Sequence, residues 1–173
     1  SDEIKPESAE VVGAINGMGC KTVMLTGDNE AIAENVAKQI GLTGYKASLL
    51  PQNKVEEAEK LLKEKGEKDV LCFVGEGIND APVLMRSDIG IAMGGVGSDA
   101  AIEASDIVLM KDDLRGIPLA KRIAQKTMAI VFQNIVFSIA VKVLILILSA
   151  FGVTNMWFAV FGDVGVAVIA ILN

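Results

Sequence analysis

Charged residues are distributed very unevenly along this chain. The last 47 of its 173 residues, Thr127 to Asn173, contain only two charged side chains, Lys142 and Asp163. The other Lys, Arg, Asp and Glu residues lie in the first 126 residues, which carry the whole formal net charge of -6. A segment so poor in charge does not form a water-exposed surface. We therefore expect two parts, one exposed to water and one in an apolar environment.

The charge-poor segment is long enough for two membrane-spanning helices. A helix crosses a hydrocarbon core of about 30 Å with roughly 20 residues. Residues 127–151 meet that length, the sequence GVTN breaks the helix, and residues 155–173 give a shorter second span with Trp157 near one interface. A hydrophobic hairpin in the core of a large soluble protein is the alternative. Two neighbouring spans with only two charges favour the membrane.

A predicted basic connecting helix, residues 113–126, precedes the first span. Its cations are Arg115, Lys121, Arg122 and Lys126. Because positive charges gather on the cytoplasmic side of membrane segments, we expect the first part of the chain to lie in the cytosol.

Strand and helix patterns alternate in residues 1–112. Apolar runs predict strands at 21–26, 46–50, 69–75, 88–93 and 106–110, and helical patterns occupy residues 5–19, 29–40, 51–66, 79–87 and 98–104. Pro6 suits the start of the first helix, and Asp28 and Gly41 suit the two ends of the second. The run at 69–75 is apolar enough for a strand covered on both faces. This order predicts an α/β domain with a mostly parallel sheet.

Three carboxylates are expected at the carboxyl ends of strands, where ligands bind in such sheets. They are Asp28, Glu76 and Asp80. Together they would offer hard oxygen ligands to Mg²⁺, with a phosphate opposite. Each alone has an ordinary alternative, because Asp and Asn commonly cap helices and a lysine on a charged helix is usually solvated. Nearby groups suited to a phosphate are Thr26, Gly27, Lys54, Gly75 and Gly77.

Composition and spacing exclude several other classes. The acidic first part argues against nucleic-acid binding, which needs clustered Lys and Arg. A Cys/His zinc site is excluded, because the chain has no His and its cysteines, Cys20 and Cys72, lie 52 positions apart. No GxGxxG follows a strand, which argues against a nicotinamide-binding domain. The polar, acidic start is not a signal peptide and indicates a cut from something longer.

Five stretches resemble the C-terminal third of heavy-metal P-type ATPases, especially the branch that exports zinc, cadmium and lead. They are MLTGDN, LLPQNK, GEGINDAPVLMRSDIGIAMG, GSDAAIEASDIVL and GDVGVAVIAILN. The resemblance implies a partial haloacid-dehalogenase-like Rossmannoid domain, the C-terminal part of the phosphorylation domain, in residues 1–112. A two-helix transmembrane hairpin would follow in residues 127–173.

The resemblance also implies roles for the loop residues. Thr26, Gly27 and Asp28 would contact the phosphoryl region, and Lys54 would stabilise its charge. Glu76 matches the position of the family's direct Mg²⁺ ligand. Asn79 and Asp80 would support it, and Gly75 and Gly77 would let the backbone approach the phosphate.

Two departures from the family pattern matter. The family has Asp where this chain has Glu76, whose extra methylene moves the carboxylate by roughly 1.5 Å, a large error for octahedral Mg²⁺. The family's DKTGT loop with the phosphorylated Asp, its ATP-binding insertion, its actuator domain and its cysteine-containing metal-entry helix are missing. The nucleophile's strand would lie between the strands ending in TGD and GEGIND, so these should pair directly, gape or leave backbone groups unpaired. This chain alone should not hydrolyse ATP.

Lys142 and Asp163 are predicted at similar depth in an antiparallel hairpin, roughly 15 Å from its turn at 1.5 Å per residue. Either charge alone at mid-membrane costs about 2.5 to 3.5 kcal/mol, which favours a functional pair over chance. The resemblance implies that Asp163 is a transport-site ligand and Lys142 its built-in counterion. A salt bridge that only stabilises the hairpin is the alternative. Gly162 and Gly165 would allow close helix approach.

The resulting hypothesis is a piece of an ATP-driven Zn²⁺, Cd²⁺ or Pb²⁺ export pump, multi-pass in a bacterial plasma membrane. Its partners would be the bilayer, the transported ion and the N-terminal remainder of the pump, with ATP bound mostly outside this chain. A truncated, non-catalytic membrane-anchored module is one alternative. A membrane-tethered phosphatase of the same superfamily is another.

Overall fold

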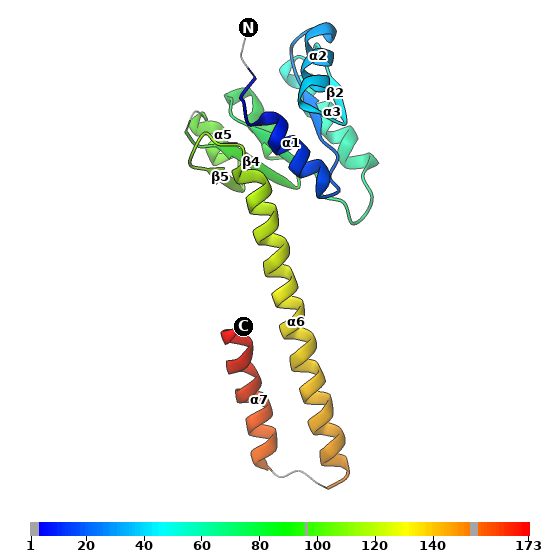
Figure 1. Cartoon of the computed structure of the whole chain (residues 1–173), viewed down its shortest axis with the longest axis vertical. Helices are drawn as coiled ribbons and strands as arrows, with labels where there is room; N and C mark the ends of the chain where they lie inside the picture. The colour runs from blue at the N-terminus through cyan, green and yellow to red at the C-terminus, as the bar shows by residue number, and fades with distance from the viewer. Residues whose placement is uncertain (1–3, 96, 153–155) are drawn as a thin grey trace. The chain divides into compact units, whose positions relative to one another are not determined.

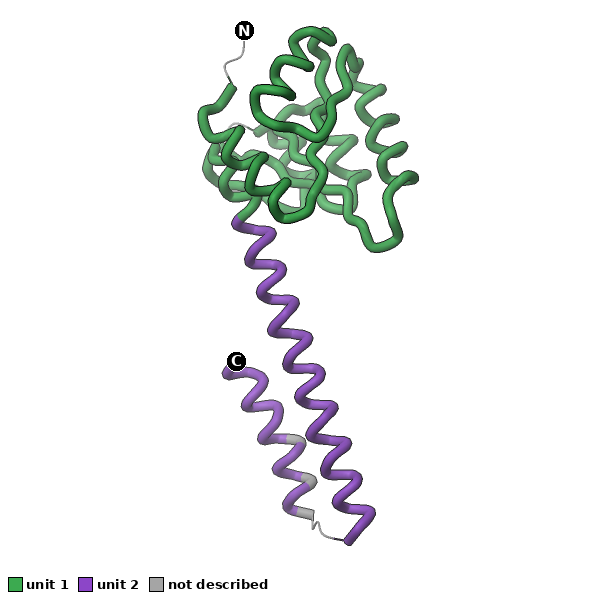
Figure 2. The backbone as a smooth tube through the Cα atoms, turned by 45° about the vertical axis from the view of Figure 1, so that its right-hand side comes forward, with its two compact units in different colours: residues 1–118 green, residues 119–173 purple. Residues whose placement is uncertain are grey.

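The computed structural model describes residues 4–95, 97–152 and 156–173, with backbone only for Met156, Ala159 and Asp163. The described chain forms two compact units, residues 1–118 and residues 119–173, coloured separately in Figure 2. The domain boundaries expected from the sequence at residues 112 and 126 stay predictions.

Helices and strands alternate through the first unit (Figure 1). In chain order the elements are α1 (Ser8–Gly17), β1 (Val23–Leu25), α2 (Glu30–Ile40), β2 (Gly44–Lys46), α3 (Pro51–Glu64), β3 (Cys72–Gly75), η1 (Ile78–Asp80), α4 (Ala81–Leu84), β4 (Ile89–Met93), α5 (Asp99–Glu103) and β5 (Ile107–Leu109). The order confirms the predicted α/β class.

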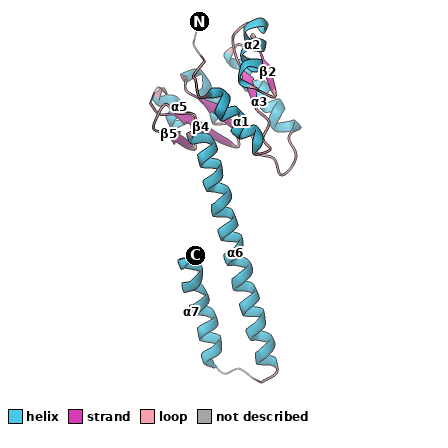
Figure 3. Cartoon of the chain, in the orientation of Figure 1, coloured by secondary structure: helices cyan, strands magenta, loops and turns pink. Residues whose placement is uncertain are grey.

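The strands form two separate parallel sheets, drawn in magenta in Figure 3. One contains β1 and β2, with Val23 opposite Gly44, and the other has the order β3-β4-β5, with Cys72 opposite Ile89. The predicted parallel pairing is therefore correct. β1 and β3, which end at the TGD and GEGIND loops, do not pair with each other. Direct pairing of these two strands is therefore absent, and each has an edge with no strand partner among the described residues.

The core of the larger sheet lies between β4 and the helices after β3. Leu84, Ala92 and Ala101 are almost completely buried there, and Phe73 of β3 packs against them. Cys72 and Val74, on the opposite face of β3, are exposed. The expectation that this strand is covered on both faces is therefore wrong. An apolar run is typical of a strand that is covered on both faces in a complete sheet. Here the described residues cover only the face of β3 that carries Phe73.

Helix ends differ from the predictions by at most three residues. α1 begins at Ser8 after Glu7, so Pro6 is not its first residue. Asn29, rather than Asp28, caps α2, because its side chain accepts a hydrogen bond from the amide of Ile32 at 3.0 Å. Gly41 ends α2 at a φ of 77°, as its position predicted.

The second strand lies earlier than predicted, at Gly44–Lys46 instead of 46–50. Residues 47–50 form a loop in which Ser48 has a φ of 55°. A left-handed backbone is uncommon for serine, so the contacts of this loop must hold it there.

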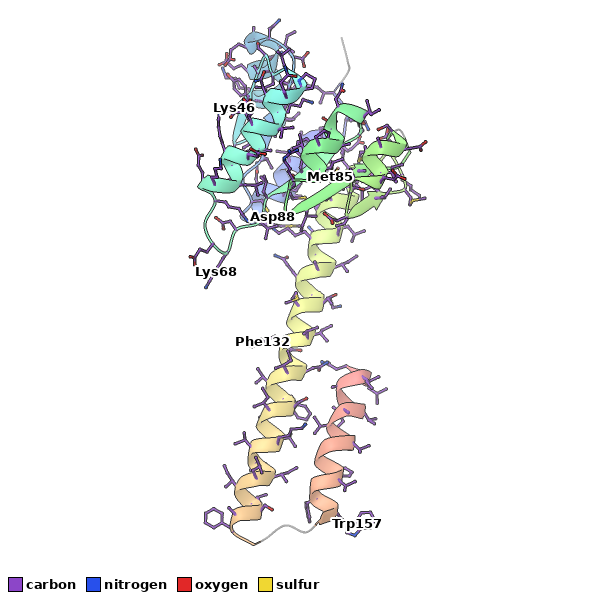
Figure 4. All side chains as sticks on the ribbon, turned by 180° about the vertical axis from the view of Figure 1, so that it is seen from behind. Lys46, Lys68, Met85, Asp88, Phe132 and Trp157 are labelled. Atoms are coloured by element: carbon purple, nitrogen blue, oxygen red, sulfur yellow. The ribbon has the colours of Figure 1, made fainter. Side chains whose placement is uncertain are left out.

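The second unit consists of long apolar helices. α6 (Gly116–Ala150) joins the predicted basic connection and the first predicted span in one helix of 35 residues, and α7 (Met156–Leu172) follows. α6 is the one helix among the described residues that is long and apolar enough to cross a membrane, with a mean hydropathy of 2.4 over its most apolar window. None of that window is buried, unlike the core helix of a soluble protein. Phe132 and Trp157, labelled in Figure 4, are likewise exposed.

Candidate functional site

The TGD loop follows β1 and is closed by hydrogen bonds within itself. The hydroxyl of Thr26 donates to Oδ2 of Asp28 at 2.8 Å, and the amide of Asp28 donates to Oγ1 of Thr26 at 3.1 Å. Because the carboxylate faces its own loop, Asp28 is not available to cap α2. This explains why the cap passes to Asn29.

The TGD loop is also tied to the loop before α3. The amide of Thr26 donates to the carbonyl of Lys46 at 2.9 Å, and the amide of Leu49 donates to the carbonyl of Thr26 at 3.0 Å. Ser48 donates its amide to the carbonyl of Asp28 at 2.6 Å, which accounts for the left-handed backbone of Ser48. These bonds fix the entry to α3, the helix that carries Lys54.

The GEGIND loop follows β3 and folds around Asp80. Oδ2 of Asp80 accepts the amides of Gly77 at 3.1 Å and of Glu76 at 3.4 Å. A Cβ at Gly75 would lie 2.7 Å from Cβ of Asp80, closer than carbon atoms can approach. Gly75 is therefore required by the close return of the loop, and Asp80 holds that loop together.

Lys54 joins the two loop systems. Its Nζ lies 3.1 Å from Oδ1 of Asp80, and the two side chains are only 23% and 14% exposed. The sequence placed these residues 26 positions apart on different elements. The structure brings them together, with Lys54 held from the TGD side and Asp80 from the GEGIND side.

Other predicted ligands stay apart from this pair. Glu76 and Asn79 are exposed, and their side chains make no hydrogen bond or ion pair within the described part of the chain. Asp28 is bound to Thr26. Among the described residues no group of three or more Asp, Glu, Cys or His side chains could hold a metal ion.

The described residues form no such group around one ion, so the expected convergence of Asp28, Glu76 and Asp80 stays a prediction. Here β1 and β3 do not pair, and the two Asp80 oxygens are engaged by Lys54 and by loop amides. Mg²⁺ requires six oxygen ligands at about 2.0 to 2.1 Å. The residues present do not complete such a set, and further ligands must come from outside them.

In the second unit, contacts between α6 and α7 are seen at two places among the described residues. A Cβ at Gly162 would overlap Cδ1 of Ile145, so the absence of a side chain permits this approach. Nδ2 of Asn134 donates to the carbonyl of Ala170 at 2.9 Å. Gly165 makes no such approach, since a Cβ there would meet only Phe161 of its own helix.

These contacts lie on either side of Lys142 and Asp163 along the two helices. The side chain of Asp163 is outside the described residues, so its pairing with Lys142 stays a prediction. Asn134 is a residue that the sequence reasoning missed. The sequence could have indicated this residue, because a polar amide within a long apolar run is a candidate for a functional or structural role.

Comparison with known proteins gives a family for the first unit. Residues 1–88, half of the chain, match the model of the haloacid dehalogenase-like hydrolases. The chain belongs to this family. The haloacid-dehalogenase-like fold expected from the sequence is thereby confirmed.

Curated relatives and solved structures extend the match over the whole chain. A zinc-transporting ATPase of Synechocystis is 53% identical over 100% of this chain and 24% of its own length, and a cadmium, zinc and cobalt-transporting ATPase of Bacillus subtilis is 52% identical over 100% and 25%. The crystal structure of a zinc-transporting PIB-type ATPase in the E2.Pi state has a TM-score of 0.89 at 38% identity, covering 98% of this chain and 27% of the other.

The resemblance to zinc- and cadmium-transporting P-type ATPases is therefore confirmed. This haloacid dehalogenase-like chain spans about a quarter of the length of the relatives that it matches. Those relatives are transporting ATPases, and the lead specificity included in the sequence hypothesis appears in none of the three names.

Proposed function

We propose that this chain is part of an ATP-driven exporter of zinc or cadmium and contributes a phosphoryl-binding face and a membrane cation site. The observation that carries the proposal is the Lys54–Asp80 ion pair at 3.1 Å, which joins α3 to the GEGIND loop, while the segment before α3 is hydrogen-bonded to the TGD loop. The ion pair lies at loops that follow the carboxyl ends of strands. In open α/β domains, ligands bind at these ends of the strands.

The carboxylates of the TGD and GEGIND loops favour a role for Mg²⁺. Asp28, Glu76 and Asp80 together would give a phosphoryl site net negative charge even with Lys54 present, and such a site repels a phosphoryl group unless a divalent cation is bound. When bound, the ion would neutralise the phosphoryl oxygens and orient them. Lys54 would add a point charge, Thr26 a hydroxyl donor, and Gly75 and Gly77 room for the backbone. Asp80 would order the loop, and Asn79 and Glu76 would lie at its exposed rim.

The membrane part would provide the cation path. α6 and α7 would form a two-helix hairpin in a multi-pass protein of a bacterial plasma membrane, with the first unit in the cytosol. Asp163 would bind the transported ion, and Lys142 would neutralise Asp163 when no ion is present. Carboxylate oxygen alone does not distinguish Zn²⁺, Cd²⁺ and Pb²⁺, so selectivity would require softer ligands from the remainder of the pump.

The remainder of the pump would also complete the sheet. β1 and β3 each have an edge without a partner among the described residues, and a strand bearing the phosphorylated Asp would pair with both. ATP would be bound mostly by that remainder. This chain alone would then have no ATPase activity.

Reconstitution tests the proposal directly. The chain is co-expressed with the preceding three quarters of a close relative, and phosphoenzyme formation from radiolabelled ATP is measured with Mg²⁺ and Zn²⁺. We expect a labelled Asp in the partner polypeptide and loss of the label in Lys54→Ala. No label from a correctly assembled pair would overturn the proposal.

A non-catalytic membrane-anchored module is the second candidate. The exposed Glu76, in place of the family's Asp, favours it because the longer side chain misplaces an Mg²⁺ ligand. Assembly with the partner without phosphorylation would support this module. Hydrolysis of small phosphate esters by the chain alone would instead indicate a tethered phosphatase.

A further inference from the structure

Asn134 is a half-buried amide on α6 that hydrogen bonds to the end of α7. Its Nδ2 donates to the carbonyl of Ala170 at 2.9 Å, and its Oδ1 accepts from Nδ2 of Asn173 at 3.0 Å. Both ends of one side-chain amide are therefore engaged with the neighbouring helix segment. The flanking residues Phe132 and Ile135 are apolar and exposed, as expected for a surface in contact with lipid.

The apolar surroundings explain why both groups of this amide are paired. In a hydrocarbon environment without water, a polar side chain must find its partners within the protein. Asn134 donates to the carbonyl of Ala170, and Asn173 in turn orients the amide of Asn134.

The bond also fixes how far α7 slides along α6. Apolar contacts tolerate a shift of one residue, about 1.5 Å, whereas a hydrogen bond of 2.9 Å does not. The contact between Gly162 and Ile145 lies further along the same helix pair. Lys142 lies between Asn134 and Ile145 on α6, and Asp163 lies between Gly162 and Ala170 on α7, so the two contacts bracket the level of both charges.

We propose that Asn134 is a positioning residue that sets the register of α7 against α6 and thereby keeps Lys142 level with Asp163. Asn134 itself does not bind the ion. The role in transport rests on the proposed function, whereas the role in helix register does not.

The register is tested in the full chain in phosphatidylcholine vesicles, in a Cys20→Ser, Cys72→Ser background. Ile145→Cys is combined in turn with Phe161→Cys, Gly162→Cys or Val164→Cys, and disulfide yield is measured. We expect the highest yield at 162. Asn134→Leu should reduce the preference for 162 about threefold, the effect of one typical interhelical hydrogen bond in a membrane.

Gln133→Leu is the matched control, because Gln133 is the exposed neighbour and makes no contact with α7 through a hydrogen bond in the described chain. It should leave the preference unchanged. Asn173→Ala removes only the second bond and should have a smaller effect than Asn134→Leu. This variant keeps the test decisive if Asn134→Leu fails to insert. An unchanged preference in both Asn variants, or equal changes in Gln133→Leu, would overturn the register role.

The transport role is tested in the reconstituted pump. Asn134→Leu should raise the half-saturating Zn²⁺ concentration for phosphorylation about threefold, in proportion to the loss of register. The half-saturating ATP concentration should not change. A shifted register with unchanged Zn²⁺ dependence would overturn the transport role alone, and absence of phosphorylation in the unmodified pump would count against the proposed function instead.

Discussion

Lys54 on α3 forms an ion pair with Asp80 at the end of η1, with Nζ and Oδ1 3.1 Å apart. Lys54 follows β2 of the small sheet, and Asp80 follows β3 of the large sheet. The pair therefore connects two sheets that share no backbone ladder. It also neutralises the carboxylate whose other oxygen, Oδ2, accepts the amides of Glu76 and Gly77 in the GEGIND loop.

The Lys54–Asp80 pair should contribute measurably to stability. A double-mutant cycle with Lys54→Met and Asp80→Asn should give a coupling of about 1 kcal/mol, at the upper end for ion pairs because both side chains are mostly covered. The measurement is urea unfolding of the full chain in detergent micelles. The pair of Lys60 with Glu57, in which the lysine is 60% exposed, is the control and should give a smaller coupling. Equal couplings would contradict the bridging role of Lys54.

Two glycines of the GEGIND loop should respond differently to alanine. Gly75→Ala places Cβ 2.7 Å from Cβ of Asp80 and should cost about 1 to 3 kcal/mol of unfolding free energy. Gly77→Ala meets its nearest atom, Oδ2 of Asp80, at 3.4 Å and should cost less. Chemical denaturation of the two variants checks the order, and the reverse order would refute the loop geometry.

Glu76→Asp should improve the response of the reconstituted pump to Mg²⁺. The shorter side chain removes an error of roughly 1.5 Å in the position of the carboxylate. We expect the half-saturating Mg²⁺ concentration for phosphorylation to fall about tenfold, the scale on which reorienting a ligand alters metal affinity. Glu67→Asp, at an exposed loop position, is the control. No change at Glu76 would show that this position does not contact the ion.

Asp88 should stabilise the fold in a manner that depends on pH. Hydrogen bonds from Nζ of Lys65 at 2.6 Å and from the amide of Leu71 at 2.7 Å hold the pKa of Asp88 below its usual 3.8. Because the folded pKa is the lower one, the contribution is complete above pH 3.8 and fades as pH falls through the pKa of the folded state.

The test compares Asp88→Asn with the unmodified chain across that range. The variant should be less stable near neutral pH, and the difference in urea midpoint should shrink below pH 3.8. Glu67→Gln, whose side chain makes no ion pair among the described residues, should show no such trend. A difference between Asp88→Asn and the unmodified chain that is constant with pH would mean that lost packing, rather than charge, causes it.

The alternation of elements could be predicted because it depends on local patterns. The apolar runs and Gly41 gave the strand and helix order of the first unit, and only the ends shifted. Asn29 caps α2 instead of Asp28 because the carboxylate of Asp28 is bound to Thr26. Sequence patterns do not distinguish between two adjacent polar residues that can both cap a helix. Residues 47–50 were predicted to belong to a strand but form a loop, because their amides donate hydrogen bonds to the TGD loop.

The candidate site was less predictable because it depends on distant elements. The sequence placed Asp28, Glu76 and Asp80 at strand ends but could not tell that the two sheets remain unpaired. It identified Lys54 without its partner. Asn134 was missed because its function depends on which carbonyl group of α7 lies opposite, and that follows from helix packing alone.

β1 and β3 each have an edge with no strand partner among the described residues, which also affects how this chain behaves when produced by itself. Val23 and Val74 on these strands are 41% and 37% exposed, and an open strand edge is a template on which another copy can add a strand. Overproduction without the proposed central strand should therefore lead to intermolecular sheets and insoluble deposits. A short peptide with the sequence of that strand should keep the chain dispersed.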